Sequence, residues 1–133
     1  MTSESKNQEF DQELANDPEY RAAVIDLLAV LAVGELTAFE RMAADSVLAP
    51  TYADKAAMGE LATIEFKHFI ALRNRLIELG ADPEVALEPF RQTLEDFHTK
   101  TKPTDWLEGL MKAFVGDGIG LDFYREISSY VDT

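Results

Sequence analysis

Two apolar segments of the chain each carry a carboxylate in the middle of their apolar face. Residues 31–42 read LAVGELTAFERM and residues 61–72 read LATIEFKHFIAL. The residues at three-, four- and seven-residue spacings from Glu35 are mostly apolar, and the same holds around Glu65, which is typical of helices that bury one face. A carboxylate that is buried alone is costly unless it is paired, protonated or bound to a metal. Both residues are therefore expected to share a partner.

The spacing of these carboxylates about a helix break predicts that they meet. Ala49-Pro50-Thr51 separates the two segments, because proline cannot continue a helix. Glu35 lies fifteen residues before Pro50 and Glu65 fifteen residues after it. With a rise of about 1.5 Å per residue, the two carboxylates are predicted to lie at one level of an antiparallel pair. His68 follows Glu65 by three residues and points to the same side, which gives the Glu-x-x-His unit of carboxylate-bridged di-metal sites.

The rest of the chain is also predicted to be helical, with no strand-like alternation. Aspartate–proline pairs and a capping threonine or aspartate mark helix starts, and Gly80 marks an end. Residues 1–16 are predicted to form a flexible tail or a short docking helix, and residues 17–133 one helical domain. The predicted helices span residues 17–48, 52–79, 82–98 and 104–130. The fold class is therefore an all-α, up-down bundle of three long helices plus a short crossover helix, with the fourth long helix absent.

A third carboxylate, Asp117, lies on an apolar face of the last predicted helix, among Leu110, Ala113, Phe114, Leu121 and Tyr124. It stands within Gly116-Asp117-Gly118-Ile119-Gly120. No strand precedes this glycine-rich segment, so a phosphate-binding loop is disfavoured. Glycines within a helix are destabilising, which indicates that backbone, metal or substrate comes close there. Asp117 is therefore predicted to be a further metal ligand.

Each candidate ligand also has an interpretation without metal. Glu65 and His68 could be solvated or paired with each other, Glu35 could accept a hydrogen bond from a threonine or tyrosine, and Asp117 could be purely structural. Three other polar residues are predicted to be structural, namely the surface carboxylates Glu40 and Glu60 and the helix-capping His98. The metal set is thus Glu35, Glu65, His68 and Asp117.

Composition narrows the function classes. The 133 residues include 25 acidic and 12 basic side chains, giving a formal net charge of −13, and there is no cysteine. This charge disfavours direct binding to nucleic acid and to anionic membranes. Without thiolates, a metal must be held by oxygen and imidazole ligands. The apolar run at residues 22–33 is shorter than a membrane span and no export signal precedes it, so a cytoplasmic location is expected.

Several segments together resemble one family. They are Gly34-Glu35-Leu36-Thr37-Ala38-Phe39-Glu40-Arg41, Ala49-Pro50, Glu65-Phe66-Lys67-His68-Phe69, Phe97-His98, Pro103-Thr104-Asp105-Trp106-Leu107-Glu108 and Gly116-Asp117-Gly118 through Asp122-Phe123-Tyr124-Arg125. This set is similar to the actinobacterial MiaE-like group of ferritin-like proteins, which are relatives of the di-iron hydroxylase acting on a modified adenosine in tRNA. The resemblance covers residues 17–130.

The resemblance implies a role for each candidate. Glu35 would be a terminal carboxylate ligand, Glu65 a bridging one and His68 the imidazole on one iron. Asp117 would supply the carboxylate of the third helix, and Asp122 is a lesser candidate for ligation or hydrogen bonding. The family continues into a final helix with a second acidic-x-x-His unit, and this sequence stops before it. Half of the ligands of the second iron are thus missing.

The difference from the family pattern leaves three possibilities: the sequence is a truncated fragment, the site is completed across two chains, or the fold has lost its metal. An apolar groove left by the absent helix favours a homodimer. The first functional hypothesis is a di-iron oxygenase or hydroxylase, an oxidoreductase acting on a small molecule or other unknown substrate. The second is a non-catalytic helical dimer with a vestigial cluster. Iron oxidation and storage would need cage assembly, which nothing in the sequence specifies.

Overall fold

The computed structural model describes residues 2–116, and within that range the regular structure is helical. In chain order the elements are α1 (Ser3–Asn16), α2 (Pro18–Asp45), the 3-10 turn η1 (Ser46–Leu48), α3 (Tyr52–Glu78) and α4 (Pro83–Lys100). A further helix occupies residues 106–116 and reaches the end of the described range. The predicted all-α fold is thereby confirmed.

The helix starts follow the capping residues that the sequence indicated. The side chain of Asp17 accepts a hydrogen bond from the Tyr20 backbone N–H, and Pro18 occupies the first turn of α2. Thr51 and Asp82 cap α3 and α4 in the same way. Before the last helix, the side chain of Asp105 accepts a hydrogen bond from the backbone N–H of Glu108. Asp105, and not the preceding threonine, is therefore the cap of this helix. α4 ends two residues later than predicted, at Lys100.

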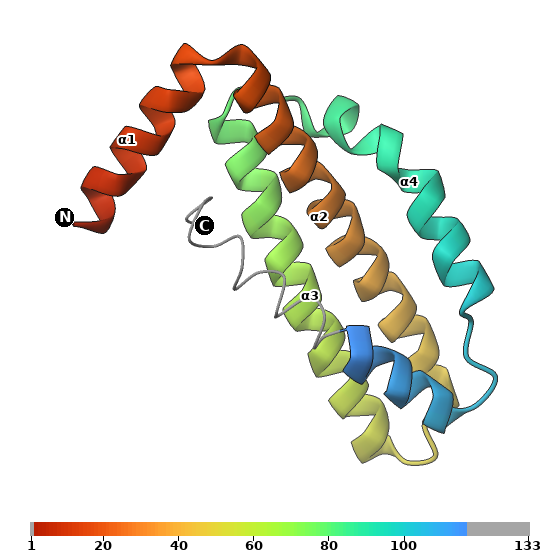
Figure 1. Ribbon diagram of the computed structural model, residues 1–133. Helices are drawn as coiled ribbons and strands as arrows, with labels where there is room; N and C mark the ends of the chain where they lie inside the picture. Colours follow the sequence, from red (N-terminus) through yellow and green to blue (C-terminus); the bar gives the residue numbers. More distant parts are fainter. Residues whose placement is uncertain (1, 117–133) are drawn as a thin grey trace.

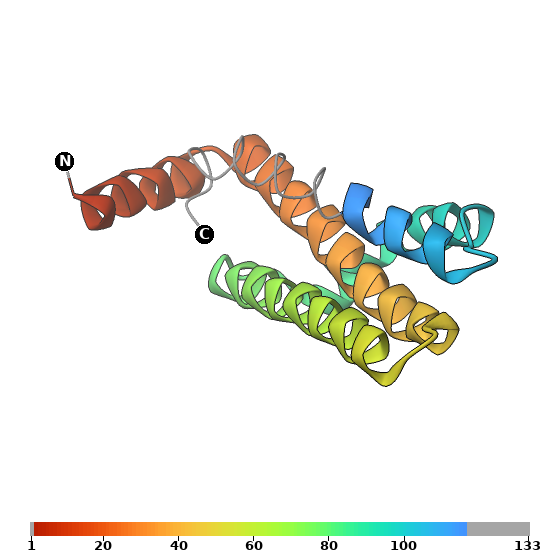
Figure 2. The same ribbon diagram turned by 90° about the horizontal axis from the view of Figure 1, so that it is seen from below.

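Helices α2 and α3 form an antiparallel hairpin, and α2 lies between α3 and α4 (Figures 1 and 2). α3 ends at Glu78, and Gly80 follows two residues later with a φ of 81°, the left-handed conformation that glycine adopts readily. The guanidinium of Arg21 in α2 donates a hydrogen bond to the carbonyl of Leu79. This contact closes the far end of the hairpin and fixes the register of the two long helices.

Residues 3–16 form a helix, the second of the two alternatives left open by the sequence. α1 leaves the hairpin at an angle (Figure 1). It is held by buried Leu14 and by an ion pair between Asp11 and Arg75 of α3 at 2.7 Å. The division of the chain into a flexible tail and a helical domain stays a prediction.

The core of the described residues consists of two clusters. The first contains Leu14, Val24, Leu28, Ala29, Ala32, Leu72 and Leu76, and the second contains Met42, Met58, Ala62 and Ala113 with Trp106 and Phe39 packed against it. Along α2, the last residue of the first cluster is Ala32 and the first residue of the second cluster is Met42. Along α3, the second cluster ends at Ala62 and the first cluster begins at Leu72. The gap between the clusters is where Glu35 and Glu65 lie.

One helical segment within the described range, Pro18–Leu48, is long and apolar enough by length and composition to cross a membrane. The apolar run judged too short from the sequence is therefore part of a longer apolar helix. A core helix of a soluble protein passes the same test, and Leu28, Ala29 and Ala32 of this segment are fully enclosed by other side chains. Of its most apolar window, 39% is buried in the structure, so packing within the hairpin accounts for part of its apolar character.

Candidate metal centre

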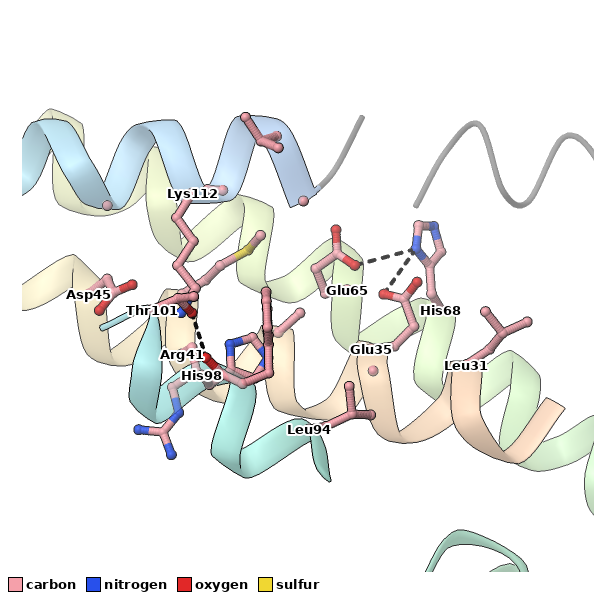
Figure 3. Close-up of a pocket in the computed structure, with 18 of the residues that line it drawn as sticks. Leu31, Glu35, Arg41, Asp45, Glu65, His68, Leu94, His98, Thr101 and Lys112 are labelled. Atoms are coloured by element: carbon pink, nitrogen blue, oxygen red, sulfur yellow. Dashed lines mark hydrogen bonds and ion pairs between the residues drawn. The ribbon is translucent and has the colours of Figure 1, made fainter. Parts of the chain in front are cut away.

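Three side chains from the two hairpin helices converge as the sequence predicted. Nδ1 of His68 lies 3.6 Å from Oε2 of Glu35 and 3.9 Å from Oε2 of Glu65. One ligand atom from each of the three residues lies within 4.8 Å of the other two. Figure 3 shows both carboxylates and the imidazole directed toward a common point between α2 and α3. The separation is small enough for one cation to contact all three groups.

The two carboxylates are buried. Glu35 is 8% exposed and Glu65 is 7% exposed, whereas the side chain of His68 is 41% exposed. Oε2 of Glu35 is shielded from solvent and has no hydrogen-bond partner within residues 2–116. An unsatisfied buried carboxylate oxygen is unfavourable in a metal-free protein and is what a cation would satisfy. The donor set of two carboxylates and one imidazole therefore fits a transition metal such as iron.

The hydrogen-bonding alternative for Glu35 can be examined directly. The nearest threonine on its helix, Thr37, donates its hydroxyl to the backbone carbonyls of Val33 and Gly34. Such a bond from a helical threonine to the preceding turn is common. Thr37 therefore does not satisfy the buried Oε2 of Glu35, and the hydroxyl partner left open by the sequence is not found in the described part of the chain.

Of the other residues considered, Glu40 and Glu60 are exposed, as expected for surface carboxylates. Asp117 and Asp122 lie outside the described residues. The proposed third carboxylate therefore stays a prediction, and so does the part of the predicted helix that follows Gly116.

The candidate ligands line a larger cavity of about 450 Å³. Its walls include apolar side chains of α2 and α4, among them Leu31 and Leu94. Glu35, Glu65 and His68 are called the triad below. Other polar groups of the cavity lie apart from the triad in Figure 3, and they belong to Arg41, Asp45, His98, Thr101 and Lys112. Small-molecule sites commonly have such a volume and a mainly apolar lining with a few polar groups.

His98 has a different role from the one expected. The sequence favoured a helix cap, but Nδ1 of His98 is buried and makes no hydrogen bond within the described residues, and the residue lines the cavity. Burial, followed by the positive charges of Lys112 and Arg41, lowers the pKa of His98 from 6.5 to about 4. The imidazole is therefore neutral at pH 7.

Asp45 and Lys112 were not recognised from the sequence as cavity residues. Burial raises the pKa of Asp45, an effect opposed by Lys112 and nearby cationic groups. Burial lowers the pKa of Lys112, with Asp45 acting in the opposite direction. Neither residue stands in a local pattern that distinguishes it from a surface charge, so only the packing of residues 106–116 against α2 reveals them.

Comparison with known families agrees with this geometry. A family model described as a ferritin-like domain of actinomycetes matches residues 18–133. The chain belongs to this ferritin-like family. The match begins at the first residue of α2 and includes all three triad residues, so the helical-bundle assignment and the ferritin-like resemblance are confirmed. Ferritin-like membership also suggests a soluble protein. No curated protein matches the sequence.

Proposed function

We propose that this ferritin-like protein binds iron through Glu35, Glu65 and His68 and acts as an oxygenase or hydroxylase of the MiaE-like type. The observation that supports the proposal is the convergence of two buried carboxylates and one imidazole within 4.8 Å, with Oε2 of Glu35 making no hydrogen bond to any group of residues 2–116. Three protein ligands leave coordination positions for water, dioxygen or substrate.

The residues of the site would each have a separate role in the reaction. Glu35 and Glu65 would neutralise much of the charge of the metal, and His68 would tune its electronic properties. Bound iron would supply the oxygen chemistry. The apolar walls formed by residues such as Leu31 and Leu94 would exclude water and accommodate the C–H group of a substrate.

By the MiaE-like resemblance, Glu65 would bridge two irons and Asp117 would join the site. A complete di-iron centre needs more ligands than the triad provides, so we also propose that two chains associate as a homodimer. Large apolar side chains are exposed on residues 106–116, notably Leu107, Met111 and Phe114, which supports association. The net charge of −13 favours a small substrate in the cytoplasm over tRNA.

Metal content is the decisive measurement. The wild-type protein, Glu65→Ala and the matched control Glu60→Ala are loaded anaerobically with ferrous iron, and elemental analysis is combined with mass determination by light scattering. Glu60 is exposed on the same helix as Glu65. We expect iron in the wild type and control and its loss in Glu65→Ala, and a doubled mass would support the homodimer.

No iron in any of the three proteins would refute the enzyme proposal. In that case the second hypothesis, a non-catalytic helical dimer with a vestigial cluster, becomes the better account. Equal iron in all three proteins would show that the metal binds elsewhere.

A further inference from the structure

The cavity that contains the triad also holds a second set of polar groups, which the proposed metal site does not use. Lys112 and His98 line it from two different helical segments, residues 106–116 and α4. Both present a buried nitrogen that has no hydrogen-bond partner among residues 2–116, Nζ of Lys112 and Nδ1 of His98. Buried polar atoms are normally satisfied, so two unsatisfied ones in a single cavity indicate a missing ligand.

The charges around these nitrogens determine the type of ligand. Arg41 and Lys112 are cationic and His98 is neutral, while Asp45 is the acidic side chain at this part of the cavity. No ion pair within 4.0 Å joins Lys112 to Asp45 in the described structure, although each affects the pKa of the other. Lys112 therefore keeps its donors available, and a neutral imidazole offers one further N–H.

We propose that the cavity binds a small amphipathic carboxylate, whose anionic head contacts Lys112 and His98 and whose apolar chain extends toward Glu35, Glu65 and His68. Charge-assisted hydrogen bonds from lysine are a strong way to hold a carboxylate in a partly apolar site. The apolar lining, including Leu31, Leu94 and Phe97, matches an alkyl chain. The anionic head is thereby kept away from the acidic triad.

This inference deepens the proposed function by naming its substrate class, and it rests on that function only for the reaction at the metal. Carboxylate binding itself depends on cavity residues outside the triad. It can therefore be measured on the metal-free full chain in the presence of a chelator. Failure of iron loading and failure of carboxylate binding are then separate results.

The test is calorimetric titration of the metal-free protein with octanoate and, separately, with 1-octanol. Octanol has the same alkyl chain without the charge. The variants are Lys112→Met, Asp45→Asn and the control Lys55→Met, since Lys55 is exposed on α3 and does not line the cavity. The fluorescence of Trp106, the single tryptophan, provides a second readout because Trp106 packs against the core cluster that contains the cavity residues Met42 and Ala113.

We expect octanoate to bind the wild type and Lys55→Met equally and to bind Lys112→Met about tenfold more weakly. The affinity for 1-octanol should be nearly unchanged by Lys112→Met. Asp45→Asn should bind octanoate more tightly, because it removes the negative charge that competes for Lys112. This opposite sign keeps the proposal testable even if Lys112→Met does not fold, which circular dichroism would show.

The proposal is overturned if the wild type does not bind octanoate, or if octanoate and 1-octanol respond alike to Lys112→Met. It is also overturned if Asp45→Asn weakens octanoate binding or leaves it unchanged.

Discussion

Replacement of Glu35 by glutamine should change the stability of the protein in opposite directions with and without metal. Glu35 and Glu65 are both buried, and their ligand atoms lie within 4.8 Å of each other. Two like charges at that distance repel by about 3.5 kcal/mol at an effective dielectric constant of about 20. A protonated His68 would offset part of this repulsion, since its Nδ1 is 3.6 Å from Glu35. In the metal-free protein, Glu35→Gln should therefore raise the free energy of unfolding by about 1–2 kcal/mol.

With metal present the sign should reverse. A metal at a hundredfold excess over its Kd stabilises the folded state by about 2.7 kcal/mol. For a chain of this length that corresponds to an increase in Tm of roughly 10 °C. Glutamine cannot supply the anionic oxygen that Glu35 offers, so the variant should lose most of this increase and melt below the metal-loaded wild type.

The assay is thermal unfolding by circular dichroism, with chelator and with anaerobic ferrous iron. Glu40→Gln is the control, because Glu40 is exposed on the same helix and loses the same charge. The control should behave as the wild type in both conditions. A Glu35→Gln variant that melts below the wild type in chelator would refute the repulsion. A variant that keeps the full iron-dependent increase in Tm would refute the ligand role of Glu35.

Two further predictions concern residues outside the triad. Burial is the main reason why the pKa of His98 is lowered from 6.5 to about 4 in the folded protein. Between these two pH values the imidazole is protonated in the unfolded chain but not in the folded one. The free energy of unfolding should therefore decrease as the pH falls from about 6.5 to about 4. Because the imidazole is only partly enclosed, we expect this loss to be about 1–2 kcal/mol and to be absent in His98→Gln, measured by urea unfolding across this pH range. Gly80→Ala should cost about 1–2 kcal/mol in urea unfolding, since φ is 81° and the new Cβ would lie 3.2 Å from Arg21. Gly59 lies in the interior of α3, and a Cβ added there would meet nothing within 4 Å, so Gly59→Ala should instead raise the free energy of unfolding by about 0.5–1 kcal/mol. Equal effects at both glycines would contradict the role assigned to the backbone of Gly80.

The hairpin and the triad could be predicted because they depend on fixed helical geometry. Asp17-Pro18 and Thr51 determine where the two long helices begin, and both cap as expected. The equal spacing of Glu35 and Glu65 about Pro50 then sets their common level, since the rise per residue is the same in both helices. Only these local rules and one tight connection were needed to predict that the three ligand atoms meet.

The second part of the cavity could not be predicted in this way. Asp45, His98 and Lys112 come from α2, α4 and residues 106–116. α2 and α4 are not consecutive along the chain, and no local pattern specifies the direction in which residues 101–105 lead from α4 to the last helix. His98 stands in the last turn of α4, where a basic residue ordinarily interacts with terminal carbonyls. The packing of α4 along α2 turns it into the cavity instead. α1 was similarly ambiguous, because Phe10 and Leu14 alone do not indicate what they pack against.

The two carboxylates of the triad interrupt the apolar core of the hairpin, and this bears on whether they serve folding or binding. Glu35 and Glu65 separate the two apolar clusters of the hairpin, between Ala32 and Met42 on one helix and between Ala62 and Leu72 on the other. Apolar side chains at both positions would join the clusters into one continuous core, and replacing buried charges by well-packed apolar groups is often neutral or stabilising. Packing therefore does not explain the carboxylates, and a hydroxyl partner for Oε2 of Glu35 is not found within residues 2–116. His68 lies within 4.0 Å of both carboxylates but is one group for two charges. A bound cation would account for both carboxylates and the adjacent imidazole at once, and the proposed metal binding therefore explains a site that weakens the core better than folding does.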